Sequence, residues 1–416
     1  MPSLHRAAWV LPIVGPPLRD GWVLVGGGRV LACGGPRDPV PPADRIEDVR
    51  YDEPLAILPG LVNAHTHLEL SWMRGRVPPA SSMPVWVSRL LAERRTAGGD
   101  PREPIAGAIH EMRASGTSLA GDVTNTLAAW EAIAGSDLSA AVFLELLGFT
   151  AADPSALVED ARERLEDLMP LERIRTAVVP HAPYSVSPDL MRAIARAADA
   201  APISVHLGES AEEMEFLRAG TGVWRTLLED LGAWSAGWEA PGCGPVEYLD
   251  RLGLVTERLV AVHAVQLDDG ELARLADAGA TVVTCPRSNR WVGAGTPPVE
   301  RFYASGVRVA VGTDSLASVE DLNLFAELAA VRRVAPAVPG ARLLRSATLD
   351  GAAALGFGGE LGSIEAGKRA ELIGVRVPPG IADVEEYLVS GVPAGAVRWL
   401  ERGWQNAGLM EDGRRW

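Results

Sequence analysis

Eight short apolar segments, separated by longer amphipathic ones, are the feature that most constrains the fold of this chain. The apolar segments are expected to be buried strands, and they occupy residues 55–65, 117–123, 140–148, 174–181, 202–209, 259–265, 281–286 and 307–314. Segments between them, such as 83–95, 154–168 and 188–200, carry apolar residues at helical spacing. Alternating strands and helices form a parallel sheet, and eight such strands close a barrel. We therefore predict an α/β fold, a (β/α)8 TIM-type barrel, over residues 57–361.

The two ends of the chain have a different pattern. Short β-type runs cut by Gly and Pro fill residues 1–56, including an apolar run at 7–17 that lacks the small-residue cleavage site of a signal peptide. Residues 362–416 return to β-type patterning and include a strand-like run at 396–404. We predict that residues 1–56 and 362–416 together form a small β-sandwich domain beside the barrel.

Charge and composition exclude several kinds of partner. The formal net charge is -15 and no basic run offsets it, so nucleic acid is not expected to bind. No uncharged apolar run approaches the roughly 20 residues of a membrane-spanning helix. The three cysteines, Cys33, Cys243 and Cys285, are far apart and fit a reducing compartment. We therefore expect a cytoplasmic protein that acts on a small molecule, with a homodimer as a possible assembly.

Histidines mark the ends of the predicted strands. His65, His181, His206 and His263 stand at the C-terminal ends of four of them, and His67 lies two residues beyond His65. Active sites of such barrels lie at this end, and residues two apart in a strand share a face. A single histidine at such a place is more often a hydrogen-bonded, partly buried side chain than a metal ligand. Five in register, together with a strand-end Asp314, reverse that balance and predict a metal site.

The expected ligands limit the choice of metal. Nitrogen and carboxylate ligands suit Zn²⁺ or Fe²⁺ better than Mg²⁺ or Ca²⁺, which prefer oxygen. We predict one zinc ion per chain, with iron as the alternative. A catalytic site keeps one position open for water, whose pKa the metal lowers.

Four strand ends, PGLVNAHTHLE, SVHLGES, VAVHAV and VGTDS, resemble the signature segments of the amidohydrolase superfamily. The resemblance extends over nearly the whole chain, although Glu371 stands where an Asp is more usual. It implies metal ligands His65, His67, His206 and Asp314, while His263 orients the attacking water or the leaving group.

The same resemblance implies a reaction. Glu209, in HLGE, matches the proton-shuttling Glu of the subgroup that deaminates aromatic rings; its alternative is a solvated carboxylate at the start of a helix. In this mechanism Asp314 takes a proton from water, the oxygen attacks an amino-bearing ring carbon, and Glu209 protonates the adjacent ring nitrogen. The only lysine is Lys368, outside the predicted barrel, so a lysine-bridged pair of metals is not expected. A bridging Glu145 stays an alternative to the single metal.

Substrate class is inferred from three further segments. HAPYSVSP, CPRSNR and HTHLELS resemble segments of adenosine-type and aminofutalosine deaminases, which favours an adenine-bearing nucleoside such as aminodeoxyfutalosine. The H-x-E and P-C-x-x-C signature of the cytidine deaminase fold is absent. The alternatives are hydrolysis of another bond on the same scaffold, in a cyclic amide, a guanine, a pterin or a chlorinated triazine, and a non-catalytic scaffold. The last is disfavoured because every ligand position is filled.

Other residues are candidates for substrate binding. They are His181, Glu145, Trp72, Ser288, Asn289 and Arg290, with Trp86, Trp224 and Trp238 as further rings that a purine could stack on. His181 is equally well explained as a hydrogen bond within its own loop, and tryptophan on a helix more often packs against the core. The long Trp- and Gly-rich segment 233–245, after the fifth strand, is a candidate lid.

Overall fold

Eight parallel strands form the centre of the computed structural model, which describes all residues except 44, 97–99 and 401–416. In chain order they are β8 (Leu61–Thr66), β9 (Thr117–Thr124), β10 (Ser139–Leu146), β11 (Ile174–Pro180), β12 (Ile203–Leu207), β13 (Leu259–His263), β14 (Thr281–Thr284) and β15 (Arg308–Val311). They form two parallel four-stranded sheets, β8 to β11 and β12 to β15. A barrel strand overlaps each of the eight predicted segments, and the TIM-type fold is confirmed.

Backbone hydrogen bonds close the two half-barrels at the strand ends. The amides of Thr313 and Asp314 both donate to the carbonyl of His65, at 3.1 and 3.0 Å, which joins β15 to β8. On the opposite side, the amide of His206 donates to the carbonyl of His181 at 2.9 Å. Each of the two junctions between the half-barrels is therefore formed by residues that were predicted to belong to the active site.

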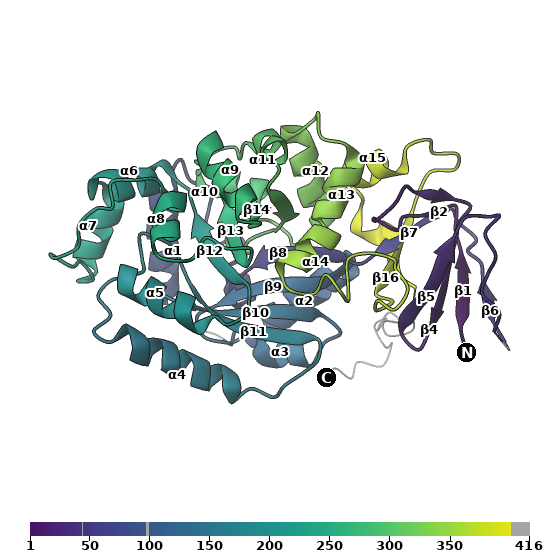
Figure 1. The fold of residues 1–416 in the computed structure, drawn as a ribbon, viewed down its shortest axis with the longest axis horizontal. Coiled ribbons are helices and arrows are strands. Elements are labelled where there is room, and N and C mark those ends of the chain that lie inside the picture. Colours follow the sequence, from purple (N-terminus) through teal and green to yellow (C-terminus); the bar gives the residue numbers. More distant parts are fainter. Residues whose placement is uncertain (44, 97–99, 401–416) are drawn as a thin grey trace.

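Helices cover the outside of the barrel (Figure 1). They are η1 (Leu68–Met73), α1 (Met83–Thr96), α2 (Arg102–Ala114), α3 (Trp130–Ala134), α4 (Pro154–Glu166), α5 (Pro188–Ala197), α6 (Ala211–Ala219), α7 (Val223–Asp230), α8 (Pro245–Arg251), α9 (Asp269–Asp277), α10 (Pro286–Val292), α11 (Val299–Ser305), α12 (Leu324–Val334), α13 (Gly340–Ser346), α14 (Leu349–Ala354) and α15 (Val384–Val389). Side chains cap several of them: Asp153, Ser187 and Ser210 each accept the amide hydrogen bond three residues ahead. Helices α1, α4 and α5 lie where the apolar spacing predicts helices.

Two small sheets lie at one end of the molecule, at the right of Figure 1, and one of them combines strands from the N-terminal and C-terminal segments. One sheet contains β1 (Ser3–Arg6), β4 (Trp22–Gly26), β5 (Arg29–Gly34) and β6 (Glu47–Val49). The other contains β2 (Trp9–Val10), β3 (Leu18–Arg19), β7 (Leu55–Pro59), β16 (Leu372–Arg376) and β17 (Val397–Trp399), with η2 (Ala394–Ala396) before the last strand. The predicted sharing of one β-structure by the two termini is thus confirmed. Part of the predicted strand 396–404, and residues 401–416 in general, lie outside the described residues.

The first predicted strand, residues 55–65, is wrong as a single element. The chain changes sheet at Gly60: β7 pairs antiparallel with β16, whereas β8 pairs in parallel with β9. Gly60 allows this crossing because a Cβ there would lie 2.6 Å from the Cβ of Ser118. The predicted domain boundary at 56/57 falls inside β7, and the division into 1–56 with 362–416 and 57–361 stays a prediction.

None of the helices in the described part of the chain is both long enough and apolar enough to cross a membrane.

Candidate active site

Three histidines from two strand ends, those of β8 and β12, converge at the C-terminal end of the barrel. The possible ligand atoms of His65, His67 and His206 all lie within 4.8 Å of one another. Asp314, three residues after β15, brings Oδ1 to 3.7 Å from His65 Nε2 and 3.6 Å from His67 Nε2. The alternation of β8 explains why both histidines of His-x-His reach this point, while the intervening Thr66 donates its hydroxyl to the carbonyl of Asp314.

The cluster fits a metal ion by its own chemistry. His65 is completely buried, and among the described residues neither of its ring nitrogens has a hydrogen-bond partner. Burial, aided by the neighbouring histidines, lowers the pKa of His65 well below its usual value and that of His206 to about 3. Neutral imidazoles with free nitrogens next to a carboxylate are the ligand set that Zn²⁺ or Fe²⁺ takes.

Asp314 is held in an unusual backbone conformation. Its φ is 62°, in the left-handed region that Asp tolerates better than most residues. Its Oδ2 accepts hydrogen bonds from Ser288 Oγ at 2.5 Å and Ser318 Oγ at 3.0 Å, which leaves Oδ1 facing the histidines. Burial raises the pKa of Asp314, but His67, His263 and the bond from Ser288 outweigh it, so the pKa is lowered overall. Asp314 is therefore an ionised carboxylate with one oxygen available.

Glu209 and His263 face each other across the cluster, with Glu209 Oε1 at 3.6 Å from His263 Nε2. Burial, with Asp314 and Glu213 nearby, raises the pKa of Glu209 well above its usual value. Burial lowers the pKa of His263 to about 4, and Asn289 Nδ2 lies 3.0 Å from its Nδ1. The raised pKa of Glu209 favours its protonated carboxyl, and the lowered pKa of His263 favours a neutral imidazole. Such a carboxyl can give a proton to a bound molecule.

A second buried carboxylate holds the loop that carries Glu209. The carboxyl oxygens of Glu213 accept the backbone amides of Gly208 at 2.9 Å and Glu209 at 3.0 Å. Ser210 caps the same helix, α6, by accepting the amide of Glu213. The sequence Ser-Ala-Glu-Glu matches a capping-box signature and could have drawn attention to Glu213.

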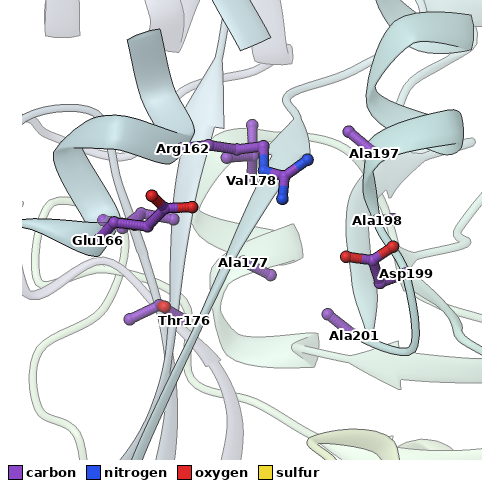
Figure 2. Close-up of a pocket in the computed structure, with 10 residues that line it drawn as sticks. Arg162, Glu166, Thr176, Ala177, Val178, Ala197, Ala198, Asp199 and Ala201 are labelled. Atoms are coloured by element: carbon purple, nitrogen blue, oxygen red, sulfur yellow. The ribbon is translucent and has the colours of Figure 1, made fainter. Parts of the chain in front are cut away.

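These groups open into a cavity of about 450 Å³. Its wall includes His67, His206, Glu209, His263 and Asp314, with Glu145 and His181 beside them. A smaller hollow of about 190 Å³ between α4, β11 and α5 is lined by residues such as Arg162, Glu166 and Asp199, and contains none of the predicted site residues (Figure 2). The cavity at the barrel's C-terminal end is therefore the candidate active site.

The residues predicted to contact the substrate do not all line the cavity. Glu145, His181, Trp86 and Trp224 line the cavity, and His181 Nδ1 also lies 2.6 Å from Ser185 Oγ, so both of its expected roles are compatible with the structure. Trp238 instead stacks on Phe216 at 4.7 Å between ring centroids.

Ser288 and Asn289 lie behind the site rather than in its wall. Both are fully buried, and their side chains reach Asp314 and His263 respectively. Trp72 and Arg290 are not part of the cavity wall described: Arg76 covers the Trp72 ring at 5.4 Å, and Arg290 is exposed near the end of α10. Helical spacing explains this difference, since Ser288 and Asn289 point inward while Arg290 turns to the surface.

Two supporting groups escaped the sequence analysis. Asn63 Oδ1 accepts the amide of Thr313 at 3.0 Å and so holds the seam near Asp314. Glu69 accepts bonds from Thr124 Oγ1, the Asn125 amide and both the amide and hydroxyl of Thr126. Their partners come from distant strands, so no local pattern could have indicated them.

A second group of possible ligands shares one member with the first. Glu145, His181 and His206 have ligand atoms within 4.8 Å of one another, and Glu145 Oε1 lies 3.4 Å from His206 Nδ1. Lys368, the only lysine, contacts neither group of possible ligands. Its Nζ donates to the carbonyl of Gly358 and to Ser363 Oγ. The single-metal site and the Glu145 alternative both stay predictions.

Glu327 beneath α10 offers a test of the electrostatics. Its Oε1 accepts the amide of Arg287 at 2.9 Å, whereas Oε2 has no hydrogen-bond partner in the described structure. Burial raises its pKa to about 8 against the pull of Arg287. Below pH 4.5, the pKa of Glu327 in the unfolded chain, Glu327 is protonated in both the folded and the unfolded state. Between pH 4.5 and about 8 only the unfolded state loses the proton, so the free energy of unfolding falls as the pH rises.

Glu327→Gln should therefore gain stability over the wild type as pH rises from 5 to 8, on the order of 1 kcal/mol or more, because Gln carries no proton to lose. Urea unfolding at several pH values measures this. Glu320→Gln, an exposed neighbour, is the control. A difference between wild type and Glu327→Gln that does not change with pH would show that Glu327 ionises freely in the folded state.

Comparison with known proteins agrees with this geometry. Residues 56–398 match the Amidohydrolase family. The aminodeoxyfutalosine deaminase of Deinococcus radiodurans is 33% identical over 360 residues, which are 81% of each chain. The 5-methylthioadenosine/S-adenosylhomocysteine deaminase of Desulforudis audaxviator is 30% identical over 403 residues, 93% of this chain and 88% of that one.

A solved structure is similar throughout. The zinc-bound adenosine deaminase of Xanthomonas campestris has a TM-score of 0.79 and 30% identity, covering 95% of this chain and 90% of that one. The chain belongs to the amidohydrolase family. Within that family it is a metal-dependent deaminase that acts on carbon–nitrogen bonds.

Proposed function

We propose that this protein is a zinc deaminase of an adenine-bearing nucleoside, aminodeoxyfutalosine or a similar 5′-substituted adenosine. One observation carries the proposal: two buried carboxyl groups, Glu209 and Asp314, line the same cavity beside the histidine cluster, and their pKa values are shifted in opposite directions, upward for Glu209 and downward for Asp314. Deamination of a purine needs both a proton for the ring nitrogen and a base for the attacking water. The named relatives act on such compounds, which supports the substrate class.

His65, His67, His206 and Asp314 would hold the metal, and Glu145 would contact either the substrate or His206. When bound, a zinc ion lowers the pKa of water so that hydroxide is available near neutral pH. The remaining chemistry belongs to the side chains. Asp314 takes the first proton of the water through Oδ1, while Ser288 and Ser318 keep Oδ2 engaged.

Glu209 gives its proton to the ring nitrogen next to the carbon under attack. Asn289 Nδ2 donates to Nδ1 of the neutral His263 ring and so orients it. The other ring nitrogen, Nε2, then positions the attacking oxygen. Asp314 then passes the water proton to the departing amino group, the carbon–nitrogen bond breaks, and ammonia leaves. The remaining hydroxyl proton returns to Glu209, which restores the starting state.

Ammonia release tests the proposal. The panel contains aminodeoxyfutalosine, 5′-methylthioadenosine, S-adenosylhomocysteine, adenosine, guanine and a chlorinated triazine, with chloride measured for the last. We expect turnover of one or more adenine nucleosides and none of the triazine. Chloride release without ammonia release would favour the rival hydrolase, and no turnover of any amine would reject the deaminase.

Metal content gives an independent prediction. Purified protein is expected to contain about one zinc or iron per chain, and a chelator should remove activity together with the metal. Elemental analysis and re-addition of Zn²⁺ measure this. Full activity of metal-free protein would contradict the assignment of the ligands. A cytoplasmic location and a homodimer stay part of the proposal and need fractionation and solution scattering.

A further inference from the structure

The outer part of the active-site cavity is lined by one face of α1. Met83, Trp86, Val87, Leu90, Leu91 and Arg94 all line it, and they recur at intervals of three or four residues. Such spacing places them on one side of the helix. Trp86 also packs in a buried apolar cluster with Met73 and Val292, so this side of the helix is partly anchored in the core and partly borders the cavity.

Helix α7 presents a second such face. Trp224, Leu227 and Leu228, with Leu231 just beyond the helix, have the same spacing and line the same cavity. The loop after β10 adds Leu147 and Phe149. Leu147 and Leu231 are 50% and 52% exposed, so this apolar wall extends to the mouth of the cavity.

Aromatic packing holds the rings of this wall in place. Phe149 stacks on Trp234 with ring centroids 5.8 Å apart, and Trp224 stacks on Tyr184 at 4.4 Å. Trp234 belongs to the segment 233–245, whose predicted role as a lid is untested; only Ala233 of that segment lines the cavity described. The apolar wall is therefore preformed rather than built when a ligand arrives.

Few charges lie outside the catalytic groups. Among the described lining residues these are Glu69, Glu145 and Arg94. Glu69 accepts a hydrogen bond from Thr124 Oγ1 at the end of β9, and Glu145 accepts one from Asn125 Nδ2 at 3.0 Å. Arg94, the one lysine or arginine among the described lining residues, lies 3.7 Å from Glu69, which offsets its charge. An arm carrying both an ammonium and a carboxylate would find no free pair of partners here.

We propose that the wall between α1 and α7 binds an apolar 5′ substituent of the nucleoside and selects against one that ends in an amino acid group. The inference rests on the proposed function. When the amino-bearing carbon of the base lies at the histidine cluster, the sugar and its 5′ arm extend toward the mouth, along the leucines. Burying each further methylene of that arm improves the specificity by roughly 10-fold until the wall is filled.

The test compares adenosine, 5′-methylthioadenosine, 5′-butylthioadenosine, 5′-benzylthioadenosine and S-adenosylhomocysteine, which share one reacting ring. We expect kcat/KM to rise at least 10-fold from the methylthio to the butylthio or benzylthio compound. S-adenosylhomocysteine should fall at least 10-fold below the butylthio compound of similar length. Values that do not change along the apolar series, or a preference for S-adenosylhomocysteine, would overturn the inference.

Leu231→Asn supplies the matched variant, because Leu231 is half exposed and its replacement should not prevent folding. The ratio of kcat/KM for the butylthio compound to that for adenosine is expected to fall about 10-fold. Val223→Asn, on the same helix, 40% exposed and outside the described lining, should leave the ratio unchanged. An unchanged ratio in Leu231→Asn would overturn the inference. If the wild-type protein released ammonia from none of these nucleosides, the proposed function itself would be rejected.

Discussion

Glu209→Gln is expected to slow ammonia release by about 10² to 10⁴ while the metal stays bound. Gln has the shape of a protonated carboxyl and fits the same buried position, but it cannot give up a proton to the ring. Glu209 is not in the group of ligand atoms that gathers around His65, so metal content should not change. Single-turnover kinetics and elemental analysis of the same preparation measure both quantities.

Glu212→Gln is the control for this prediction. Glu212 lies three residues further along the chain, in the first turn of α6, and is not part of the cavity wall described. It should have wild-type kinetics. Normal turnover by Glu209→Gln would show that the ring nitrogen receives its proton from another group.

His65→Ala is expected to abolish both metal binding and turnover, with activity below about 10⁻⁴ of the wild type. His65 is completely buried and offers two ring nitrogens with no hydrogen-bond partner in the described structure, so its removal deletes a ligand that no neighbour replaces. Metal analysis and ammonia release measure the two effects, and circular dichroism shows whether the barrel still forms.

The matched change is His110→Ala, which removes an exposed histidine from α2 on the outside of the barrel. This variant should keep one metal per chain and full activity. If His65→Ala kept its metal, the ion would have to lie elsewhere, and the second group around Glu145 and His181 would become the first candidate.

The barrel and the centre of its site were predictable because their signals are local. Each barrel strand is a short apolar run, and parallel strands bring their C-terminal ends to one place, so His65, His206 and Asp314 could be grouped before any geometry was known. The roles of these residues still await the experiments above.

What could not be predicted depends on contacts between distant segments. The division of residues 55–65 at Gly60 follows from pairing with β16, which no nearby residue indicates. Ser288 and Asn289 have the polar character of substrate contacts, but only the fold shows that Asp314 and His263 lie in front of them. Likewise, the spacing in α1 predicts a helix without telling whether its apolar side meets the core or a cavity.

The passage of the chain from the terminal sheet to the barrel at Gly60 affects how the protein folds during synthesis. Leu58 in β7 pairs with Ile373 in β16, 315 positions later, whereas only Gly60 separates β7 from the first barrel strand. Contacts between residues so far apart form slowly because the intervening chain must first be ordered. The central strand of the terminal sheet must therefore wait for nearly the whole polypeptide to leave the ribosome. Until then the edge of β7 that β16 will cover has no partner strand.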